Sequence, residues 1–531
     1  MPRPHRHQRR KPTEVGRPSV PKILGADVEL GNFILGIAAP DGTGQTASRR
    51  LLREVPGVES GFASRNVQDW GRKFLPTNGG CAYIDSDHLE MALPETFSAF
   101  DHVTYWRAML ATVRHAMRHA NDGLPEGCRL QVLVNCSDGH DNSYGSHVNV
   151  LLTRTAWDDI FHRRPHYLAY LAAFQVSSVI YTGQGKVGSE RGRPEVDFQL
   201  SQRADFIETL VGLDTMARRP IVNTRDEPLC GSTVLDATSG SSLARLHVIF
   251  FDSTLCQIAT LLRVGTLQMI TAMLEAGCVN ASLALDDAVI ALGRWSRDPS
   301  LTARARMTDG GMATALELQF RFLEDAERFA ARGGFDGIVP DADRLLVVWE
   351  DTLVRLRAGD FDTLSRRLDW VLKRRLLQGV LDRRPELSWQ SPELKYLDQL
   401  FASLDENEGL FWACERRGQV DRVVDGAAVE NAVAEPPGDT RAWTRAHLLR
   451  RVPTDHIDHV DWDHVRVKRP GHHPWIPRTT VVPLPLPFGA TRATNEIHFA
   501  GDKTVEAVLE VLGAIDEDRY DGGSSIRTSS Q

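Results

Sequence analysis

The sequence predicts an α+β protein with more than one structural unit, and three observations lead to this prediction. The chain has 531 residues, which is long for a single hydrophobic core. Alternating segments typical of strands are concentrated in the first half, whereas residues 300–425 show mostly helical periodicity. The Pro-Pro-Gly break at Glu435–Gly438 indicates a boundary before a small C-terminal unit.

Four segments follow from these observations. Residues 1–21 are rich in Pro, Arg and His and carry too little apolar surface to offset the entropy of ordering, so we expect a disordered basic arm. Residues 22–434 form the large domain, and residues 435–517 form the small C-terminal domain. Residues 518–531 form a Gly/Ser tail that we expect to be disordered.

The composition indicates a soluble globular protein and argues against nucleic-acid and membrane partners. The content is 42% hydrophobic and 25% charged, which is ordinary for a soluble globular protein. The formal net charge of −8 argues against nucleic-acid binding, which requires a basic face. The seven cysteines include no CxxC pair and indicate cytosolic thiols rather than disulfides or a zinc site. No apolar run approaches the ~18–20 residues of a membrane span, and the N-terminus lacks the apolar region of a signal peptide. We therefore expect a cytoplasmic protein with no membrane partner.

The large domain opens with strand patterns. Lys22–Ile37 predicts a first strand with Asp27 and Glu29 on one face. The polar, irregular residues 38–77 form a long connection with a short helix at Ala47–Glu54, and connections of this length are often functional.

Helical periodicity and polar loops follow. Phe100–Ala120 predicts a core helix, and the strand Leu130–Val134 runs into a dense polar loop at 135–149. Leu255–Ala276 predicts another long helix. Scaffold helices are expected at Thr314–Arg332, Asp341–Arg357, Leu364–Leu381, Pro392–Asp405 and Gly409–Arg417, and the C-terminal unit is expected to contain helices at Thr440–Arg451 and Thr504–Ala514 and a strand around His459–Val467.

The segment Cys81–Glu90 is the strongest candidate for a functional site. In one extended strand Tyr83 and Asp85 would share one face, and His88 and Glu90 the other. A short strand with several carboxylates and an imidazole is a poor core strand, because unpaired ionised groups are costly to bury. It fits the floor of a cleft where carboxylates hold a cation or attack a carbonyl; the alternative is a polar edge strand.

Other segments give weaker signals. Glycines flank a lysine in residues 181–188, but their spacing matches no established phosphate-binding motif. Arginines and carboxylates gather in 199–205 and 218–228. Arginine suits phosphate and carboxylate clamps, although surface ion pairs would give the same composition.

Six motifs occur in one order over most of the chain. They are Gly25-Ala-Asp-Val-Glu-Leu-Gly31, Tyr83-Ile-Asp-Ser-Asp-His-Leu-Glu90, Asn142-Ser-Tyr-Gly-Ser-His-Val-Asn149, Phe198-Gln-Leu-Ser-Gln-Arg203, Ile221-Val-Asn-Thr-Arg-Asp-Glu-Pro228 and Arg245-Leu-His-Val-Ile249. Together they resemble the family of Pup ligases and Pup deamidases/depupylases. The resemblance implies a glutamine-synthetase-like large domain, in which a curved antiparallel sheet forms a cradle backed by helices, and a small C-terminal α/β domain.

The resemblance also implies roles for individual residues and implies Mg²⁺ and ATP or ADP as cofactors. The catalytic aspartate of the family corresponds to Asp85, and the nucleotide-contacting tryptophan corresponds to Trp462. Metal-binding positions correspond to Asp27, Tyr83 and Glu90; cleft positions that contact phosphate or substrate correspond to Arg203, Arg225 and His247.

Several positions depart from the family pattern. Cys81 replaces a nucleotide-binding arginine, Val148 and Gln257 replace glutamates, and Asp27 replaces a longer glutamate. Since Mg²⁺ requires oxygen ligands and charge, we expect weaker binding of Mg-ATP. Ligation consumes ATP whereas amide hydrolysis need not, so the departures favour a hydrolase.

Motifs near Pro94-Glu95, Leu387-Ser-Trp389 and 436–442 resemble the depupylase branch, although the connection at 32–77 is shorter than in depupylases.

The resulting hypothesis is an amidase that hydrolyses the C-terminal Gln side-chain amide, or the isopeptide bond, of Pup or a Pup-like protein. Asp85 acts as nucleophile or general base. His88 and His147 are candidate proton carriers, with hydrogen-bonded loop histidines as the alternative. Two other functions remain open: an ATP-dependent ligase that joins a glutamate carboxylate to a lysine amine, and a non-catalytic Pup-binding paralogue.

Overall fold

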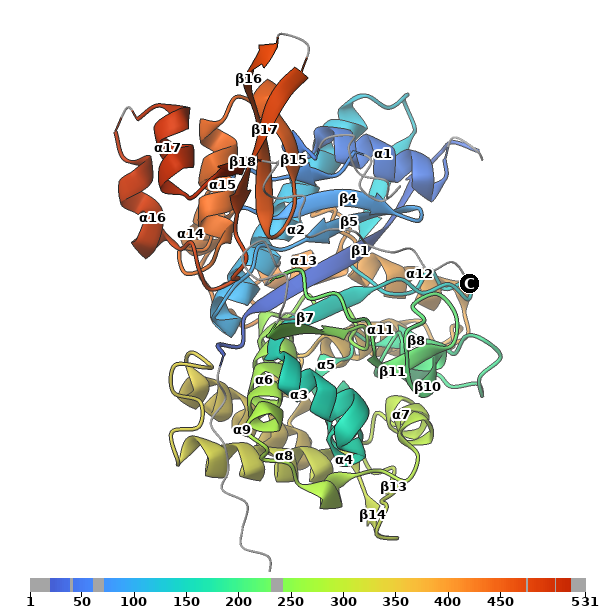
Figure 1. Cartoon of the computed structure of the whole chain (residues 1–531). Coiled ribbons are helices and arrows are strands. Elements are labelled where there is room, and N and C mark those ends of the chain that lie inside the picture. Colours follow the sequence, from blue (N-terminus) through green and yellow to red (C-terminus); the bar gives the residue numbers. More distant parts are fainter. Residues whose placement is uncertain are drawn as a thin grey trace, which may run out of the picture.

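The computed structural model describes residues 20–38, 42–60, 71–230, 242–473, 476–501 and 503–516, without the side chains of 469–478. The predicted arm and tail lie almost entirely outside these residues. The predicted α+β class is confirmed: helices and antiparallel strands form a large unit with a smaller C-terminal unit beside it (Figure 1).

The large unit is built on one antiparallel sheet in the order β12-β7-β1-β5-β4-β3-β2, with β6 also paired to β1. The long strand β1 makes this possible, because its first half pairs with β5 and β7 and its second half pairs with β6. The strands are β1 (Leu24–Leu35), β2 (Val58–Glu59), β3 (Lys73–Phe74), β4 (Cys81–Asp85), β5 (His88–Ala92), β6 (Arg129–Leu133), β7 (Ser146–Thr153) and β12 (Leu243–Val248).

Alternation from Leu24 to Leu30 of β1 divides the sheet into two faces. Ala26, Val28 and Leu30 are buried against the helices, whereas Asp27 and Glu29 point to the opposite, partly open face. This alternation has the period of two that a half-buried strand requires. The opposite face, which we call the cleft face, therefore carries the polar residues of β1.

The predicted single strand at residues 81–90 is wrong: the segment is a hairpin. β4 and β5 meet at a tight turn in which Ser86 has a φ of 53°, and Tyr83 pairs with Glu90 and Asp85 with His88. Directly opposed residues of antiparallel strands share a face. His88 and Glu90 therefore lie on the same face as Tyr83 and Asp85, not on the other face as predicted.

Two helices cover the closed face of the sheet. α2 (Ala99–Asp122) contacts β1 and β6, and α6 (Gln257–Glu275) contacts β7 and α2. α6 is long and apolar enough to cross a membrane, but it is buried within the protein, as the core helix of a globular domain is. Both predicted core helices are thus confirmed, each within a few residues of its predicted ends.

The remaining elements of the large unit surround this core. Below β7 in Figure 1 lie α3, α4, α8 and α9, and α11 to α13 lie behind the sheet. The helices are α1 (Gly44–Glu54), α3 (Arg154–Asp158), α4 (Pro165–Ser177), α5 (Val179–Thr182), α7 (Ala288–Ser296), α8 (Ala315–Ala330), α9 (Ala342–Ala358), α10 (Phe361–Leu364), α11 (Asp369–Arg383), α12 (Pro392–Phe401), α13 (Leu410–Arg416) and α14 (Gly426–Ala434); short strand pairs are β8 (Lys186–Val187) with β9 (Phe198–Gln199), β10 (Ile207–Gly212) with β11 (Arg219–Asn223), and β13 (Ala305–Arg306) with β14 (Met312–Ala313).

The C-terminal unit packs against the β2–β4 edge of the large sheet. Its four-stranded antiparallel sheet and its helices share a hydrophobic cluster with Phe74, Cys81 and Ala92 of the large unit. The elements are α15 (Ala442–Arg451), β15 (Ile457–Val460), β16 (His464–His473), β17 (Ile476–Pro483), α16 (Arg492–Phe499), α17 (Val505–Val511) and β18 (Ile515–Asp516).

A buried ionic cluster joins the two units. Glu95, which follows β5, accepts hydrogen bonds from Arg441 Nε at 2.7 Å and from Arg445 Nη2 at 2.6 Å. Arg445 also donates to the carbonyl oxygens of Gly79 and Trp462. Burial alone would raise the pKa of Glu95, but the two guanidinium groups lower it to about 2. One carboxylate thus fixes α15 and Trp462 against the large sheet.

We expect Glu95→Gln to destabilise the protein by about 3–5 kcal/mol, because two buried guanidinium groups lose their counter-charge. The lowered pKa makes this stabilisation fully present above pH 4.5 and lost as the pH falls toward 2. Urea unfolding between pH 3 and 7 measures both effects, and the variant should lose this part of the pH dependence.

The control is Glu386→Gln, which removes an exposed carboxylate paired to Arg384 at 2.8 Å. It should leave stability nearly unchanged, because exposed ion pairs contribute little. Equal effects of the two substitutions would contradict the structural role of Glu95.

Candidate functional site

A cleft of about 640 Å³ opens where the cleft face of the sheet meets the C-terminal unit. Its floor is the start of β1, its sides come from β4, β7 and the 225–230 segment, and Trp462 closes one end. Four of the predicted site residues line it: Asp27, Tyr83, Arg225 and Trp462.

The cleft combines charged side chains of both signs with apolar surface. Its lining includes four arginines and four acidic residues: Arg72, Arg225, Arg245 and Arg441, with Asp27, Glu95, Glu227 and Asp461. Arg72 lies over the Tyr83 ring, with 4.3 Å between its Cζ and the ring centroid. Arginine side chains suit phosphate oxygens, and an aromatic side chain suits a planar base. The described residues therefore fit a nucleotide with its phosphates toward the sheet.

Three carboxylates meet on the cleft face beside this cleft. Oxygen atoms of Glu29, Asp85 and Glu90 lie within 4.8 Å of one another, and we call these residues the carboxylate cluster. β1 and β5 pair Glu29 with Glu90, and the hairpin brings Asp85 to the same face. Carboxylate oxygens are the ligands that Mg²⁺ prefers, so this donor set fits a magnesium ion.

The electrostatics of the carboxylate cluster support the same conclusion. Burial first, and then the nearby Asp27 and Glu29, raise the pKa of Glu90 well above its usual 4.5. The Tyr83 hydroxyl hydrogen-bonds to Glu90, and burial and that carboxylate raise the Tyr83 pKa well above 10. Clustered carboxylates repel one another, and a cation removes that cost. Tyr83 and Glu90 thus lie together as the predicted metal-binding pair requires.

Asp85 and His88 are paired directly beside the turn of the hairpin. Asp85 is partly exposed, so it is not part of the packed interior. His88 lies 4.4 Å from the Tyr144 ring, with its Nδ1 3.9 Å from Glu29 Oε2. Burial lowers the pKa of His88, which keeps it neutral at pH 7 and able to accept a proton. The two side chains are placed as a nucleophile or base with a neighbouring proton acceptor.

The remaining histidines form a second group with Asp27, and we call Asp27, His147 and His247 the histidine cluster. Asp27 Oδ2 lies 2.8 Å from His147 Nδ1, and Asp27 Oδ1 accepts from Asn149. Burial would raise the pKa of Asp27, but His147 lowers it below its usual range. Burial lowers the pKa of His247 well below 6.5. Asp27 thus lies with imidazoles rather than within the carboxylate cluster.

Arg203 does not line the cleft. It is buried and donates to the Tyr144 carbonyl oxygen and the Ser143 hydroxyl. The guanidinium therefore holds the backbone beside His88, so any effect on substrate passes through that segment.

Two of the departures from the family pattern do not reach the cleft. Val148 points to the helix side of the sheet between His147 and Asn149, and it is fully buried. Gln257 lies at the start of α6, where its side-chain oxygen accepts from the Val423 and Val424 amides. Neither position removes a carboxylate from the cleft, so the argument that they weaken Mg-ATP binding is wrong. Cys81 does lie on the cleft face, and burial raises its pKa to about 12.

The sequence analysis did not include Glu29 or Arg72 among the candidate site residues. The sequence did contain a pattern that indicates Glu29, because it lies two residues after Asp27 and therefore shares its face of β1. No pattern in the sequence indicated Arg72. This residue lies next to β3, and it reaches Tyr83 because β3 pairs with β4.

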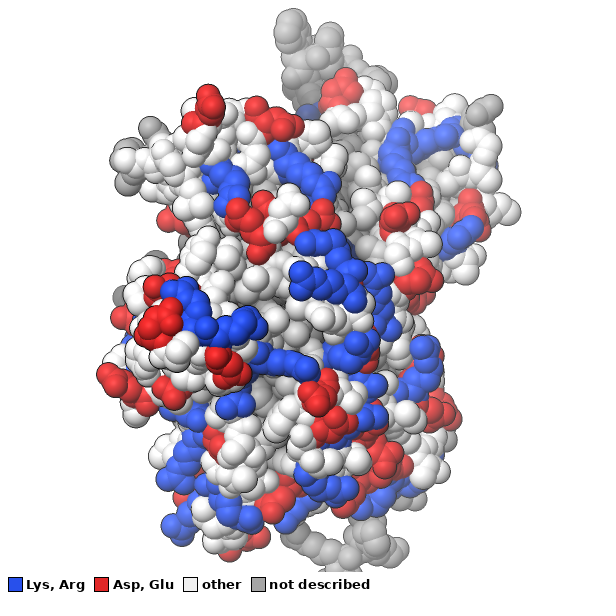
Figure 2. All heavy atoms as spheres, turned by 180° about the vertical axis from the view of Figure 1, so that it is seen from behind, with Lys and Arg blue, Asp and Glu red and all other residues white. Residues whose placement is uncertain are grey.

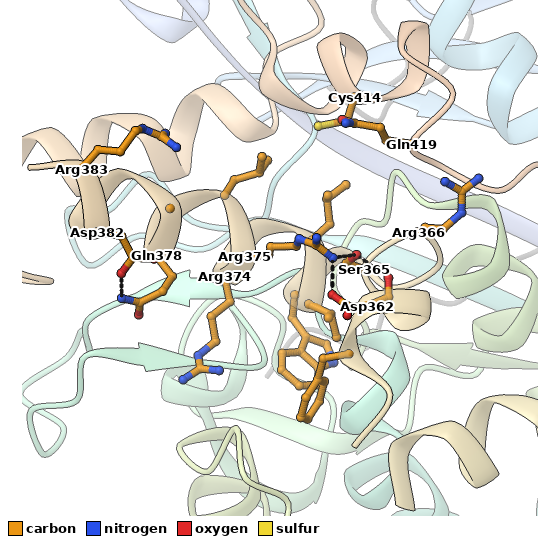
Figure 3. A pocket seen from close by; sticks show the side chains of 16 residues that line it. Asp362, Ser365, Arg366, Arg374, Arg375, Gln378, Asp382, Arg383, Cys414 and Gln419 are labelled. Atoms are coloured by element: carbon orange, nitrogen blue, oxygen red, sulfur yellow. Dashed lines mark hydrogen bonds and ion pairs between the residues drawn. The ribbon is translucent and has the colours of Figure 1, made fainter. Parts of the chain in front are cut away.

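A larger hollow of about 900 Å³ lies among α10, α11 and α13 on the face away from the cleft. Lys and Arg gather in a band across that face (Figure 2), and Arg366, Arg374, Arg375 and Arg383 surround the hollow (Figure 3). Its acidic side chains are Asp362, which pairs with Arg375, and Asp382, which accepts from Gln378. It lacks the clustered carboxylates and imidazoles of the cleft face, so the chemistry belongs to the cleft.

The chain is similar both to depupylases and to Pup–protein ligases. It is 38% identical to a depupylase of Acidothermus cellulolyticus, with 78% of each chain covered. It is 34% identical to a Pup–protein ligase of Acidimicrobium ferrooxidans, covering 80% of this chain and 90% of the relative.

Solved structures agree with the predicted fold. The complex between Pup and its ligase PafA matches with a TM-score of 0.74 at 23% identity, covering 93% and 91% of the two chains. The Pup ligase PafA in complex with ADP matches with a TM-score of 0.69 at 26% identity, covering 83% and 90%. The family model described as Pup-ligase protein matches residues 41–466. The chain therefore belongs to the Pup ligase family, whose members include both ligases and depupylases.

Proposed function

We propose that this protein is a depupylase-like amidase that hydrolyses the C-terminal Gln side-chain amide of Pup or the isopeptide bond of a pupylated protein. The observation that carries the proposal is that the partly exposed Asp85 belongs to the carboxylate cluster and is paired across the hairpin with His88. The similarity to depupylases, at 36–38% identity, supports hydrolysis, and the similarity to ligases, at 30–34% identity, keeps ligation as the alternative.

In this mechanism the chain supplies a nucleophile or base and a proton carrier. In one route Asp85 removes a proton from the water that attacks the amide carbonyl carbon; in the other Asp85 attacks this carbon itself, the amine leaves, and water then hydrolyses the acyl–Asp85 anhydride. His88 carries a proton given up by water to the leaving ammonia or lysine amine. His147, which Asp27 holds in place, lies further along the same face and is a second proton carrier. Arg203 keeps the Ser143–Tyr144 backbone in place beside His88.

The cofactors implied by the family fit the residues of the cleft. Mg²⁺ would be held by Tyr83, Glu90 and Glu29, with Asp27 adjacent, and would stabilise negative charge on the substrate oxygen. Arg72, Arg225, Arg245 and Trp462 would hold ATP or ADP. Because Val148 and Gln257 lie outside the cleft, a bound nucleotide agrees with the structure better than its complete loss. The free cysteines agree with a cytoplasmic location.

The alternative function is ATP-dependent ligation of a Pup glutamate to a lysine, which the similarity to ligases supports. Incubation with Pup ending in Gln, Pup ending in Glu, or a pupylated protein, each with and without ATP, separates the two. Ammonia or free Pup supports hydrolysis. Product formed only from the Glu form, ATP and an amine supports ligation. No product in any mixture contradicts both and leaves a Pup-binding paralogue.

We expect Asp85→Asn to reduce turnover at least ~10²- to 10⁴-fold, because the amide cannot act as nucleophile or base. Ammonia release from Pup ending in Gln measures this effect. The control is Asp87→Asn, which changes the exposed carboxylate of the same turn and should retain activity. Full activity of Asp85→Asn would refute the catalytic assignment.

We expect Trp462→Ala to weaken binding of Mg-ADP by about tenfold or more, because base–aromatic stacking contributes ~1–3 kcal/mol. A thermal-shift titration measures this change. Trp389→Ala is the control, since Trp389 packs on Phe198 and does not line the cleft. If both variants bind Mg-ADP as the unaltered protein does, Trp462 has no part in the nucleotide site.

A further inference from the structure

We propose that Arg219 binds the free main-chain carboxylate of the substrate's C-terminal residue, in a subsite beside the hairpin and away from Trp462. The inference rests on the proposed function, because it states how the same site recognises its substrate.

The chemistry of the proposed substrates requires a place for a second anionic group. In the Gln amide, and in an isopeptide bond through the same side chain, the bond that breaks belongs to the side chain of the last residue. The main-chain carboxylate of that residue therefore stays free. Four carbon–carbon bonds join its carbon to the side-chain carbonyl carbon, so the two lie about 5 Å apart in an extended side chain. A cation near Asp85 would meet this charge.

A short series of contacts joins Arg219 to the hairpin. Arg219 Nη2 donates to the Ser143 carbonyl oxygen at 2.6 Å. The ring of the next residue, Tyr144, lies against the His88 ring with 4.4 Å between the centroids. His88 in turn pairs with Asp85 across the hairpin. One dipeptide, Ser143-Tyr144, thus links Arg219 to the groups proposed to act on the substrate.

Arg219 is a buried cation without an anionic partner among the described residues. It is 8% exposed, and its one hydrogen bond there goes to the Ser143 carbonyl oxygen. A guanidinium has five N–H donors, so most of them are left for a ligand. Removing a charge from water without pairing it is costly, and a bound carboxylate would offset that cost.

The charges around Arg219 include both signs. After burial, the nearby Arg203 and Arg191 lower the pKa of Arg219 to about 10, whereas Glu29 and Asp214 act in the opposite direction. Asp214 is exposed, so water and salt screen it. Glu29 belongs to the carboxylate cluster, so Arg219 lies near that cluster without forming an ion pair with it.

The guanidinium of Arg219 is held in place before a substrate binds. Its backbone pairs with Ile207 of β10, and its Cζ lies 5.9 Å from the centroid of the Phe206 ring. Arg203 fixes the segment that Arg219 contacts, because it donates to Ser143 Oγ and to the Tyr144 carbonyl oxygen. A fixed planar fork matches a carboxylate and loses little freedom on binding it.

The position of Arg219 along β11 separates it from the arginines that suit phosphate. Arg219 is the first residue of β11, whereas Arg225, which lines the cleft with Trp462, follows two residues after the strand ends. A strand rises ~3.3 Å per residue, so β11 alone places ~13 Å between them. A nucleotide at Trp462 and a substrate carboxylate at Arg219 would therefore not compete.

Two forms of Pup ending in Gln test the proposal: one with a free main-chain carboxylate, and one in which this carboxylate is capped as the N-methylamide. The cap removes the negative charge and would release methylamine, so ammonia reports only on the side chain. We expect kcat/KM to be about 10- to 100-fold lower for the capped form, mainly through KM, because a charge-assisted contact is lost.

Substitutions at position 219 assign this discrimination to one side chain. Arg219→Gln should lower kcat/KM for the free acid by about the same factor and leave the capped form nearly unchanged. Arg219→Lys keeps the charge without the fork and should retain part of the discrimination. The control is Arg218→Gln, which removes the exposed neighbouring arginine and should keep it in full. Circular dichroism and thermal unfolding establish that each variant is folded.

Three results would overturn the proposal. They are equal rates for both forms with the unaltered protein, full discrimination in folded Arg219→Gln, and an equal loss on both forms in that variant, which would mean that Arg219 only holds the Ser143 carbonyl oxygen. Weaker binding of Mg-ADP in Arg219→Gln, with discrimination unchanged, would assign Arg219 to the nucleotide instead.

Binding separates this inference from the proposed function. Calorimetry measures the affinity of each form of Pup for the Asp85→Asn protein, with and without Arg219→Gln. If the unaltered protein releases no ammonia, yet the free acid binds more tightly than the capped form and Arg219→Gln removes the difference, the subsite stands and hydrolysis is refuted. Equal affinities for the two forms would refute the subsite whether or not ammonia is released.

Discussion

The arrangement of the cleft depends on one buried carboxylate, Glu95, and the two arginines that surround it. Through Arg445 this carboxylate connects the Gly79 backbone, the end of β5 and the Trp462 carbonyl oxygen. The charges are removed from water, so their hydrogen bonds must be satisfied within the protein. Because Arg441 also donates to the Leu229 carbonyl oxygen, the same cluster positions a segment that lines the cleft. The two units therefore present the Trp462 side of the cleft as one surface.

The sheet, in turn, separates two kinds of donor on one face. β1 carries Asp27 toward β7 and Glu29 toward the hairpin, although the two residues are only two positions apart. One strand thus supplies a carboxylate to the imidazoles and another to Asp85 and Glu90. The short distance between the two clusters couples their charges, as the raised pKa of Glu90 shows.

The sequence predicted the elements whose signals are local. The alternation along β1 and the apolar periodicity of α2 and α6 depend on neighbours in the chain, and each was placed within a few residues. The motif around Asp85 and the family were also predicted, and the family model confirms the latter. The roles of the individual site residues remain predictions.

The errors came from pairings that no local pattern reveals. The turn at Ser86 reversed the chain inside a motif interpreted as one strand, which changed the face assigned to His88 and Glu90. Val148 and Gln257 were assigned to the cleft only because of the motifs in which they lie. Val148 points into the core. The Gln257 side chain accepts hydrogen bonds from the Val423 and Val424 amides. Arg72 contacts Tyr83 because β3 and β4, which are consecutive strands joined by residues 75–80, pair with each other.

The separation between Trp462 and the hairpin has a consequence for divergence within such enzymes. Trp462 belongs to the C-terminal unit, whereas Asp85, Glu90 and Glu29 belong to strands of the large sheet. Under the proposed function, substitutions around α15 can therefore change the affinity for a nucleotide without altering Glu29, Asp85 or Glu90. The nucleotide dependence and the acidic groups of such a protein can thus diverge independently.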